Sequence, residues 1–290
     1  MNSLPDAAND KRLSLPWPII GLSLLVLFFT LITYLFLVSQ HNAFNTRTYD
    51  FARFSQAIWN VLHGRFLFTS IDYRSILGNH FSPYMALLAP LLLAWPDERA
   101  LLLVQAASVA AAGLILALIL YRHHPGLAPF FLLAFFLNPA VHHLTLFEFR
   151  RVVLIMPFLA LALLALERGK RPLMLAALLV ALLGKENVGI FVAGVGLFLL
   201  LARRDLWWGL GLIILGLCWT VIISLWVIPS FGKPGSEYSQ LYYFDYLGGS
   251  YAEIIATLNA DPLIIVRQLW ERDRLQALVR LFLPLGILLP

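Results

Sequence analysis

The chain has 290 residues, of which 60% are hydrophobic and only 13% are charged, and its mean hydropathy is +0.81. Soluble domains carry about 25% charged residues, so this composition excludes a water-soluble protein and indicates an all-α membrane protein with several spans. The formal charge of +5 comes mostly from basic residues in short loops between apolar segments, a pattern typical of membrane topology and not of nucleic-acid binding.

Two basic residues, Lys11 and Arg12, precede the first apolar run, which covers residues 17–39 and is long enough to cross a bilayer. This run is too long for the core of a signal peptide, and no small-x-small cleavage site follows it. We therefore expect an uncleaved anchor, with residues 1–15 on the cytoplasmic side of a plasma membrane. The only cysteine, Cys218, lies in an apolar segment, so the sequence offers neither a disulfide nor a cysteine metal site.

Residues 40–99 form a mixed polar and aromatic segment that we expect outside the membrane. Apolar residues recur at spacings of three and four from Phe51 to Leu62, which predicts a short helix lying on the bilayer surface. Asp50 is placed to cap the start of this helix, and Gly64 is placed to end it.

Residues 81–95 decide the predicted topology. They are apolar, but about fifteen residues reach only about 22 Å at 1.5 Å per residue, so we predict a half-inserted or surface helix. Residues 100–121 then run inward, residues 127–141 return outward, residues 152–166 run inward again, and the basic loop 167–171 is cytoplasmic. If residues 81–95 crossed the membrane, that loop would lie outside, and the preference of positive charge for the cytoplasm favours the first topology.

The apolar segment that covers residues 172–202 is interrupted by Lys185 and Glu186. One straight helix would place both charges near the bilayer centre, at a cost of several kcal/mol before they pair. We therefore predict two short helices, residues 172–184 and 188–202, with the two charged residues at an external turn. Their shortness implies a locally thinned membrane or a deep polar cleft.

A long helix is predicted to end near Pro229, and residues 230–277 form a second external segment. Ser250 and Glu253 match a capping box there, and an amphipathic helix is expected over residues 261–275. An apolar segment that starts at residue 281 is cut short at residue 290, which suggests a fragment. The predicted fold is thus a bundle of about seven or eight transmembrane helices that forms one domain, residues 16–290.

The polar residues outside the predicted spans gather near the external ends of the apolar segments. Ionisable residues at membrane depth are functional candidates, although each has a plainer interpretation. Asp50 is equally well explained as a helix cap, and Lys185 with Glu186 as a mutually neutralising pair. Arg150 and Arg151 are suited to lipid headgroups without catalysis. The adjacent His142 and His143 are more often interfacial than ligands.

Several motifs occur in an order that resembles a known family: Asp50 with Gln56, Trp59 and Gly64; His80-Phe81-Ser82-Pro83; Asn138-Pro139; and Lys185-Glu186-Asn187. Over about residues 45–290 the chain resembles the predicted membrane protein family known as domain of unknown function 2079. That family is grouped with the GT-C glycosyltransferases, which are multi-spanning enzymes that use polyprenyl-phosphate-linked sugars. In the GT-C fold an essential acid lies in the first external loop, and a second acid lies in the next one.

The resemblance implies that Asp50 is the catalytic acid of the first loop, acting as general base, and that Glu148 is the second acid. It also implies a substrate-binding set: Gln56, Asn79, His80, Arg150, Arg151, Lys185 and Glu186. The family tends to show Asp-Phe-His where this chain has Glu148-Phe149-Arg150. The carboxylate remains, but an arginine replaces the histidine, which weakens the assignment of a metal site. Whether the protein uses a divalent cation as cofactor is therefore left open. We expect Asp50, His80, Glu148 and Lys185 to converge on one external cavity.

The partners implied by this resemblance are a polyprenyl-phosphate lipid and membrane lipids. The alternative functions are a transporter or a non-catalytic lipid-binding membrane protein. A transporter would place ionisable residues near the midplane within repeated halves, whereas this chain places them near one face. That asymmetry favours chemistry on a lipid-linked substrate at the membrane surface.

Overall fold

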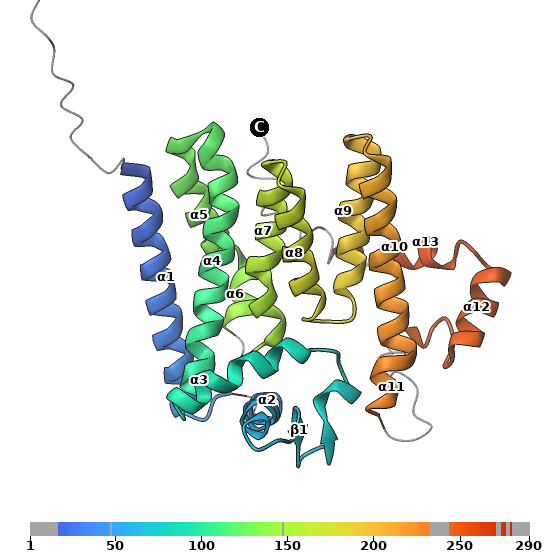
Figure 1. Ribbon diagram of the computed structural model, residues 1–290, viewed down its shortest axis with the longest axis horizontal. Coiled ribbons are helices and arrows are strands. Elements are labelled where there is room, and N and C mark those ends of the chain that lie inside the picture. The colour runs from blue at the N-terminus through green and yellow to red at the C-terminus, as the bar shows by residue number, and fades with distance from the viewer. Residues whose placement is uncertain are drawn as a thin grey trace, which may run out of the picture.

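The computed structural model describes residues 17–46, 48–146, 148–232, 244–270, 274–276 and 279. These residues are mostly helical, and the long helices stand side by side (Figure 1). The segment assigned to the cytoplasm, residues 1–15, lies outside the described residues. The same holds for the apolar segment that begins at residue 281.

Three helices in the described part of the chain are long and apolar enough to cross a membrane: α1 (Trp17–Asn42), α4 (Arg99–His123) and the continuous helix Leu206–Ser230. The last comprises α10 (Leu206–Ile222), a π-helical turn η5 (Ile223–Val227) and α11 (Ile228–Ser230). A bent pair, Pro125–Leu137 and Pro139–Thr145, makes a fourth if it is one span. The helical membrane class is confirmed, while length and composition alone support fewer spans than the seven or eight expected.

The bent pair consists of η3 (Pro125–Leu127) with α5 (Ala128–Leu137), followed by α6 (Pro139–Thr145) at an angle of 58°. Asn138 has extended backbone, and its side chain accepts a hydrogen bond from the N–H of Ala140 at 2.8 Å. An asparagine cap followed by proline starts a new helix and disfavours continuation of the old one. The break therefore follows from the local sequence.

Shorter apolar helices run alongside the long ones: η4 (Arg151–Ile155) with α7 (Met156–Glu167), α8 (Arg171–Leu182) and α9 (Val188–Ala202) (Figure 1). The turn between α8 and α9 holds Lys185 and Glu186, which confirms the predicted break. Helices α9 and α10 approach so closely that a Cβ added at Gly189 would lie 2.2 Å from the carbonyl oxygen of Gly216. Small residues of this kind let two membrane helices pack backbone against backbone.

One end of the bundle is covered by the segment that follows α1, and we call it the α2 end (Figure 1). The segment comprises α2 (Thr48–Val61), the antiparallel strands β1 (Phe68–Thr69) and β2 (Arg74–Ser75), η1 (Ile76–Gly78), η2 (Pro83–Leu88) and α3 (Ala89–Ala94). The predicted helix is confirmed, and Gly64 follows it with a φ of +72°. Asp50 is not at the cap, because α2 begins two residues earlier and places Asp50 in the first turn.

The predicted short helix over residues 81–95 is confirmed as η2 and α3, which lie across the α2 end (Figure 1). At the opposite end, Arg122 and His123 both contact Glu167 Oε1 at 3.1 Å, which ties α4 to α7. Arg171 pairs with Asp205 and ties α8 to α10. The basic loops after α4, α7 and α9 therefore gather at the end away from α2, as the preferred topology predicts.

The segment predicted to form the second external loop is described in part, as α12 (Tyr251–Ala260) and α13 (Ile264–Leu269). The Ser250 side chain accepts the N–H of Glu253 at 3.3 Å, which confirms the predicted cap. Helix α13 is shorter than the expected 261–275, and residues 271–273 lie outside the described residues.

Candidate functional site

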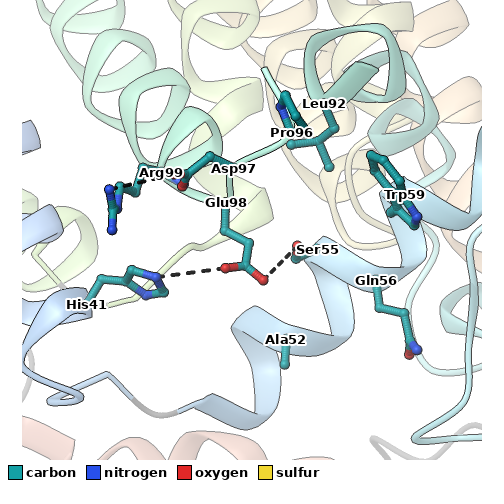
Figure 2. A pocket seen from close by; sticks show the side chains of 10 residues that line it. All are labelled: His41, Ala52, Ser55, Gln56, Trp59, Leu92, Pro96, Asp97, Glu98 and Arg99. Carbon is teal, nitrogen blue, oxygen red and sulfur yellow. Dashed lines mark hydrogen bonds and ion pairs between the residues drawn. The ribbon is translucent and has the colours of Figure 1, made fainter. Parts of the chain in front are cut away.

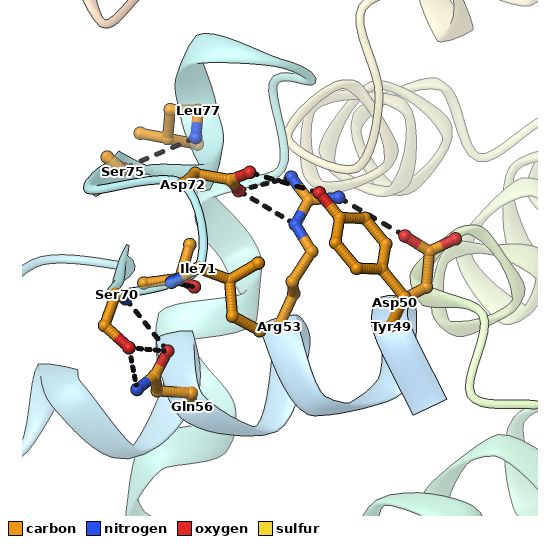
Figure 3. A network of polar contacts seen from close by, with 10 residues as sticks. Tyr49, Asp50, Arg53, Gln56, Ser70, Ile71, Asp72, Ser75 and Leu77 are labelled. Carbon is orange, nitrogen blue, oxygen red and sulfur yellow. Dashed lines mark hydrogen bonds and ion pairs between the residues drawn. The ribbon is translucent and has the colours of Figure 1, made fainter. Parts of the chain in front are cut away.

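Helix α2 separates two polar regions because its side chains project in different directions. Phe51, Phe54 and Ile58 are 3%, 5% and 0% exposed and anchor the helix in the protein core. One stripe, with Ala52, Gln56 and Trp59, lines a cleft (Figure 2). Another stripe, with Asp50 and Arg53, faces the loop between β1 and β2 (Figure 3). At about 100° per residue the two stripes point about 120° apart, and Gln56, three residues after Arg53, lies at the edge between them.

Arg53 holds the second stripe in place. It is only 5% exposed, and its Nε and Nη2 donate to Oδ2 of Asp72 at 2.8 and 2.6 Å (Figure 3). Its Nη1 donates to Oδ1 of Asp50 at 3.3 Å, one turn earlier on α2. The Asp50 side chain is nevertheless 51% exposed. A positioned carboxylate that is open to solvent is the group a general base requires.

A second polar group joins the loop before η2 to the turn between α8 and α9. His80 Nδ1 lies 2.9 Å from Oε1 of Glu186, which is 2% exposed, and the N–H of Phe81 donates to Oε2 of Glu186 at 3.2 Å. Ser82 Oγ donates to the carbonyl of Gly184 at 2.8 Å. These contacts join segments about a hundred residues apart in the chain.

Burial lowers the pKa of His80, although the hydrogen bond with Glu186 opposes this shift. A neutral His80 is therefore favoured near pH 7. The short contact with Glu186 requires a proton between Nδ1 and the carboxylate, so the neutral ring carries its proton on Nδ1. The Nε2 atom is then a hydrogen-bond acceptor.

Arg151 connects the two polar groups. Its guanidinium lies over the ring of Phe54, 4.9 Å from the centroid, and its backbone carbonyl accepts the hydroxyl of Tyr84. Burial lowers the pKa of Arg151, and the negative charges of Glu186 and Asp50 oppose this shift. Its Nε is buried without a hydrogen-bond partner among the described residues. Such a guanidinium remains charged and suits an anionic ligand.

Charged side chains from separate segments thus gather at the α2 end. We call this set the charged cluster: Asp50, Arg53, Asp72, His80, Arg151, Lys185 and Glu186. Among the described residues, no group of three or more His, Cys, Asp or Glu side chains is arranged to hold a metal ion. The cluster places a half-exposed carboxylate, Asp50, near the charges of Arg53 and Arg151.

Of the residues expected to converge, Asp50, His80 and Lys185 belong to the cluster, since His80 interacts with the charges of both Arg151 and Lys185. Asn79 precedes His80 and ends η1. Glu148 is buried at 6% exposure, beside Phe149, whose ring packs against Phe51 and Phe54 of α2.

Arg150 and Gln56, which the resemblance assigned to substrate binding, each make a hydrogen bond outside the charged cluster. The Arg150 N–H donates to Gln105 Oε1 at 2.6 Å, which fixes the chain just before η4. Gln56 lies on the other stripe of α2 and donates to Ser70 Oγ at 2.9 Å (Figure 3). Gln56 is therefore not part of the charged cluster.

Sequence reasoning missed Arg53 and Asp72 as parts of the site. Arg53 carries a usable signal, because it lies three residues after Asp50 on a predicted helix and so faces the same way. Asp72 carries none, because its approach depends on how the β1–β2 hairpin folds over α2.

The fold and the cluster together define a helical membrane protein with a charged site at one end of its bundle. The family model for a predicted membrane protein, DUF2079, matches residues 40–289, and the chain belongs to this family. The comparisons with curated proteins and with solved structures found no match.

Proposed function

We propose that the chain is a GT-C-like glycosyltransferase that transfers a sugar from a polyprenyl-phosphate donor. The observation that carries the proposal is the charged cluster itself. It combines the half-exposed, positioned carboxylate of Asp50 with the buried guanidinium of Arg151, and these two groups interact electrostatically. A base for an acceptor hydroxyl and a cation for a leaving phosphate are the two groups that this reaction needs.

The proposal includes a membrane topology. Helices α7, α8 and α9 cross the membrane with the longer ones, giving seven or eight spans in one domain, residues 16–290. The N-terminus lies in the cytoplasm, and the α2 end, with the external loops 40–99 and 230–277, faces outward from the plasma membrane. The gathering of basic loops at the opposite end supports this orientation, because positive charge favours the cytoplasmic side.

In the proposed reaction, Asp50 removes a proton from the acceptor hydroxyl as its oxygen attacks the anomeric carbon. The bond from that carbon to the phosphate oxygen breaks in the same step, and polyprenyl phosphate leaves with the bonding electrons. A single displacement inverts the anomeric configuration. Arg53 is engaged by Asp72 and Asp50, so neutralising the phosphate falls to Arg151 and Lys185.

The other residues of the site have supporting roles in this scheme. The Nε2 atom of His80 accepts a hydrogen bond from a substrate hydroxyl, and Glu186 fixes the His80 ring through Nδ1. Asn79 and Arg150, which adjoin His80 and Arg151 in the chain, bind substrate in this scheme. Glu148 acts as the second acid of the GT-C pattern from its buried position beside Phe149.

A lipid donor also needs a place for its chain. An apolar groove of about 300 Å³ lies between α1 and the α5–α6 pair, lined by Phe29, Phe36 and Phe136 among others. Helix α1 leads from this groove toward the α2 end, where the His41 ring contacts the edge of Phe51. The groove suits an isoprenoid chain or a membrane lipid.

The transporter alternative is less well supported. The long helices Trp17–Asn42 and Leu206–Ser230 hold no Asp, Glu, Lys or Arg, and in Arg99–His123 such residues occur only at the ends. A substrate path through the bilayer usually places ionisable groups near its midplane.

The test measures transfer in membranes that contain the overproduced chain. The probes are radiolabelled glucose, mannose and N-acetylglucosamine, each linked to undecaprenyl phosphate, and the readout is label that leaves the lipid fraction. Asp50→Asn should lower the rate by about a hundredfold or more while the protein is made normally. Asp261→Asn, a matched change of an acid between α12 and α13, should leave the rate unchanged. Full activity of the Asp50→Asn protein would refute the assignment.

A further inference from the structure

A cleft of about 560 Å³ lies beside α2, on the stripe of that helix that holds Ala52, Gln56 and Trp59 (Figure 2). Its walls come from the end of α1, from α2, from α3 and from the turn that precedes α4. Its volume falls within the range of about 300–1,000 Å³ that is usual for small-molecule sites. The side chains that matter for the argument are His41, Gln56, Trp59, Asp97, Glu98 and Arg99.

Glu98 is the central polar group of this cleft. Its side chain is 51% exposed, and Oε1 accepts the hydroxyl of Ser55 at 3.4 Å while Oε2 lies 3.8 Å from Nε2 of His41 (Figure 2). Both contacts are long for hydrogen bonds to a charged group, which are usually about 2.7–2.9 Å. A carboxylate has about four acceptor positions, so Glu98 retains capacity for a ligand.

The charge of the lining disfavours anionic ligands. Asp97 and Glu98 contribute −2 and Arg99 contributes +1, so the lining carries −1 with His41 neutral. Arg99 is also paired with Asp97, at 3.6 Å. A phosphate or a nucleotide would therefore meet net repulsion here, whereas the charged cluster offers the cation Arg151.

The polarity of the lining also excludes a lipid chain, which suits the apolar groove beside α1 instead. Trp59 is 40% exposed and, with Leu92 and Pro96, offers an apolar surface beside the polar groups of the cleft. A molecule with an apolar ring face and many hydroxyl donors at its edge matches both features. Its hydroxyls can donate to Glu98 and Asp97, while its ring face covers Trp59.

We propose that this cleft binds a neutral saccharide. The inference goes beyond the transferase proposal and does not depend on it, because the cleft and the charged cluster lie on different stripes of α2 and share no residue. If both proposals hold, the cleft is where a glycan acceptor is held while its end reaches the charged cluster. Gln56, which the resemblance assigned to substrate binding, belongs to this cleft.

The test uses the full-length chain in detergent, labelled with a fluorophore and applied to an array of neutral oligosaccharides. Every glycan that is bound is then measured in solution by isothermal titration calorimetry. We expect at least one neutral glycan to bind, and choline chloride not to displace it. Failure of the wild-type chain to bind any neutral glycan would overturn the proposal. Binding of choline in the cleft instead would overturn it equally, because it would define a cation site.

Variants assign the binding to the cleft. Trp59→Ala and Glu98→Gln should each weaken the glycan Kd by about tenfold or more, since each removes a direct contact. Trp226→Ala, at a 64% exposed tryptophan of η5, is the matched control and should change nothing. Asp50→Asn should also bind normally, which separates this test from that of the transferase.

Each variant must elute as a single species in size-exclusion chromatography before its Kd is measured. Glu98→Gln preserves side-chain volume and carries the test alone if Trp59→Ala aggregates. Wild-type affinity in the folded Glu98→Gln protein would place the saccharide elsewhere and refute the assignment to this cleft.

Discussion

Replacing Arg53 by Met should destabilise the α2 end strongly, because Arg53 is the charge partner of a nearly buried carboxylate. The side chains of Arg53 and Asp72 are 6% and 13% exposed, and two short hydrogen bonds join them. In the variant Asp72 would retain only the hydroxyl of Tyr49, at 3.4 Å. Breaking a buried ion pair from one side costs about 3–5 kcal/mol, and the slight exposure of Asp72 places our expectation near 3 kcal/mol.

The contact of Arg53 with Asp50 should contribute little to this loss. Asp50 is 51% exposed and lies 3.3 Å from Nη1, and exposed pairs are worth about 0–1 kcal/mol. Asp50→Asn should therefore change the free energy of unfolding by less than about 1 kcal/mol. That small effect makes Asp50→Asn a suitable probe of activity.

The free energy of unfolding is measured by titrating the detergent-solubilised protein with sodium dodecyl sulfate. Arg65→Met, at an exposed arginine that follows α2, is the control and should stay within about 0.5 kcal/mol of wild type. Arg53→Met combined with Asp72→Leu should recover part of the loss, because no unpaired charge is left behind. A loss below about 1 kcal/mol in Arg53→Met alone would show that this pair does not hold the hairpin on α2.

Three further predictions concern the helix packing, the His80 contact and the topology. Gly189→Ala should destabilise the protein by about 1–3 kcal/mol, since its Cβ would lie 2.2 Å from a carbonyl oxygen of α10. Gly194→Ala is the control and should not destabilise the protein, because a Cβ there would meet nothing within 4 Å. Equal unfolding curves for the two variants would contradict this prediction. Because burial lowers the pKa of His80, the folded state binds fewer protons than the unfolded one near that pKa. The contribution of His80 to stability should therefore be full above about pH 6.5 and be lost as the pH falls below it. His80→Gln should accordingly make the melting temperature depend less on pH between about 7.5 and 5. The topology is tested in a protein whose native cysteine is replaced by serine. A cysteine in place of Tyr73, which is 85% exposed, should react with an impermeant maleimide on intact cells, whereas one in place of Arg168 should react only after permeabilisation. The reverse pattern would invert the topology.

Much of the fold could be predicted because the bilayer restricts what a chain can do. A backbone in hydrocarbon must satisfy its own hydrogen bonds, so long apolar runs predict helices such as α1 and α4. The turn between α8 and α9 was predictable for a related reason, since Lys185 and Glu186 are costly at the bilayer centre. The exact start of α2 was not, because helix ends depend on local contacts that shift a boundary by one or two residues.

The candidate site was predictable only where local sequence determines it. Asp50 stands out as the first acid after an apolar run, and Lys185 with Glu186 interrupt another. The partner of Arg53 could not be found this way, because Asp72 is 19 positions away and reaches Arg53 through a two-stranded hairpin. The link between His80 and Glu186 spans 106 positions and depends on how η2 meets the α8–α9 turn. Such pairs are set by tertiary packing.

The position of α2 bears on how the two proposed sites would work together. Helix α2 is only 14 residues long, and its core face is fixed by aromatic packing on Phe149. Asp50 belongs to its first turn and Trp59 to its last, about two and a half turns further on, so an extended glycan held against Trp59 has to run along the helix and around to its other stripe to meet Asp50. The same arrangement would keep a lipid-linked donor near Arg151 apart from a soluble acceptor until the acceptor hydroxyl arrives. An acceptor shorter than this path would bind the cleft without being glycosylated, and comparing the binding and the transfer of oligosaccharides of increasing length tests that consequence directly.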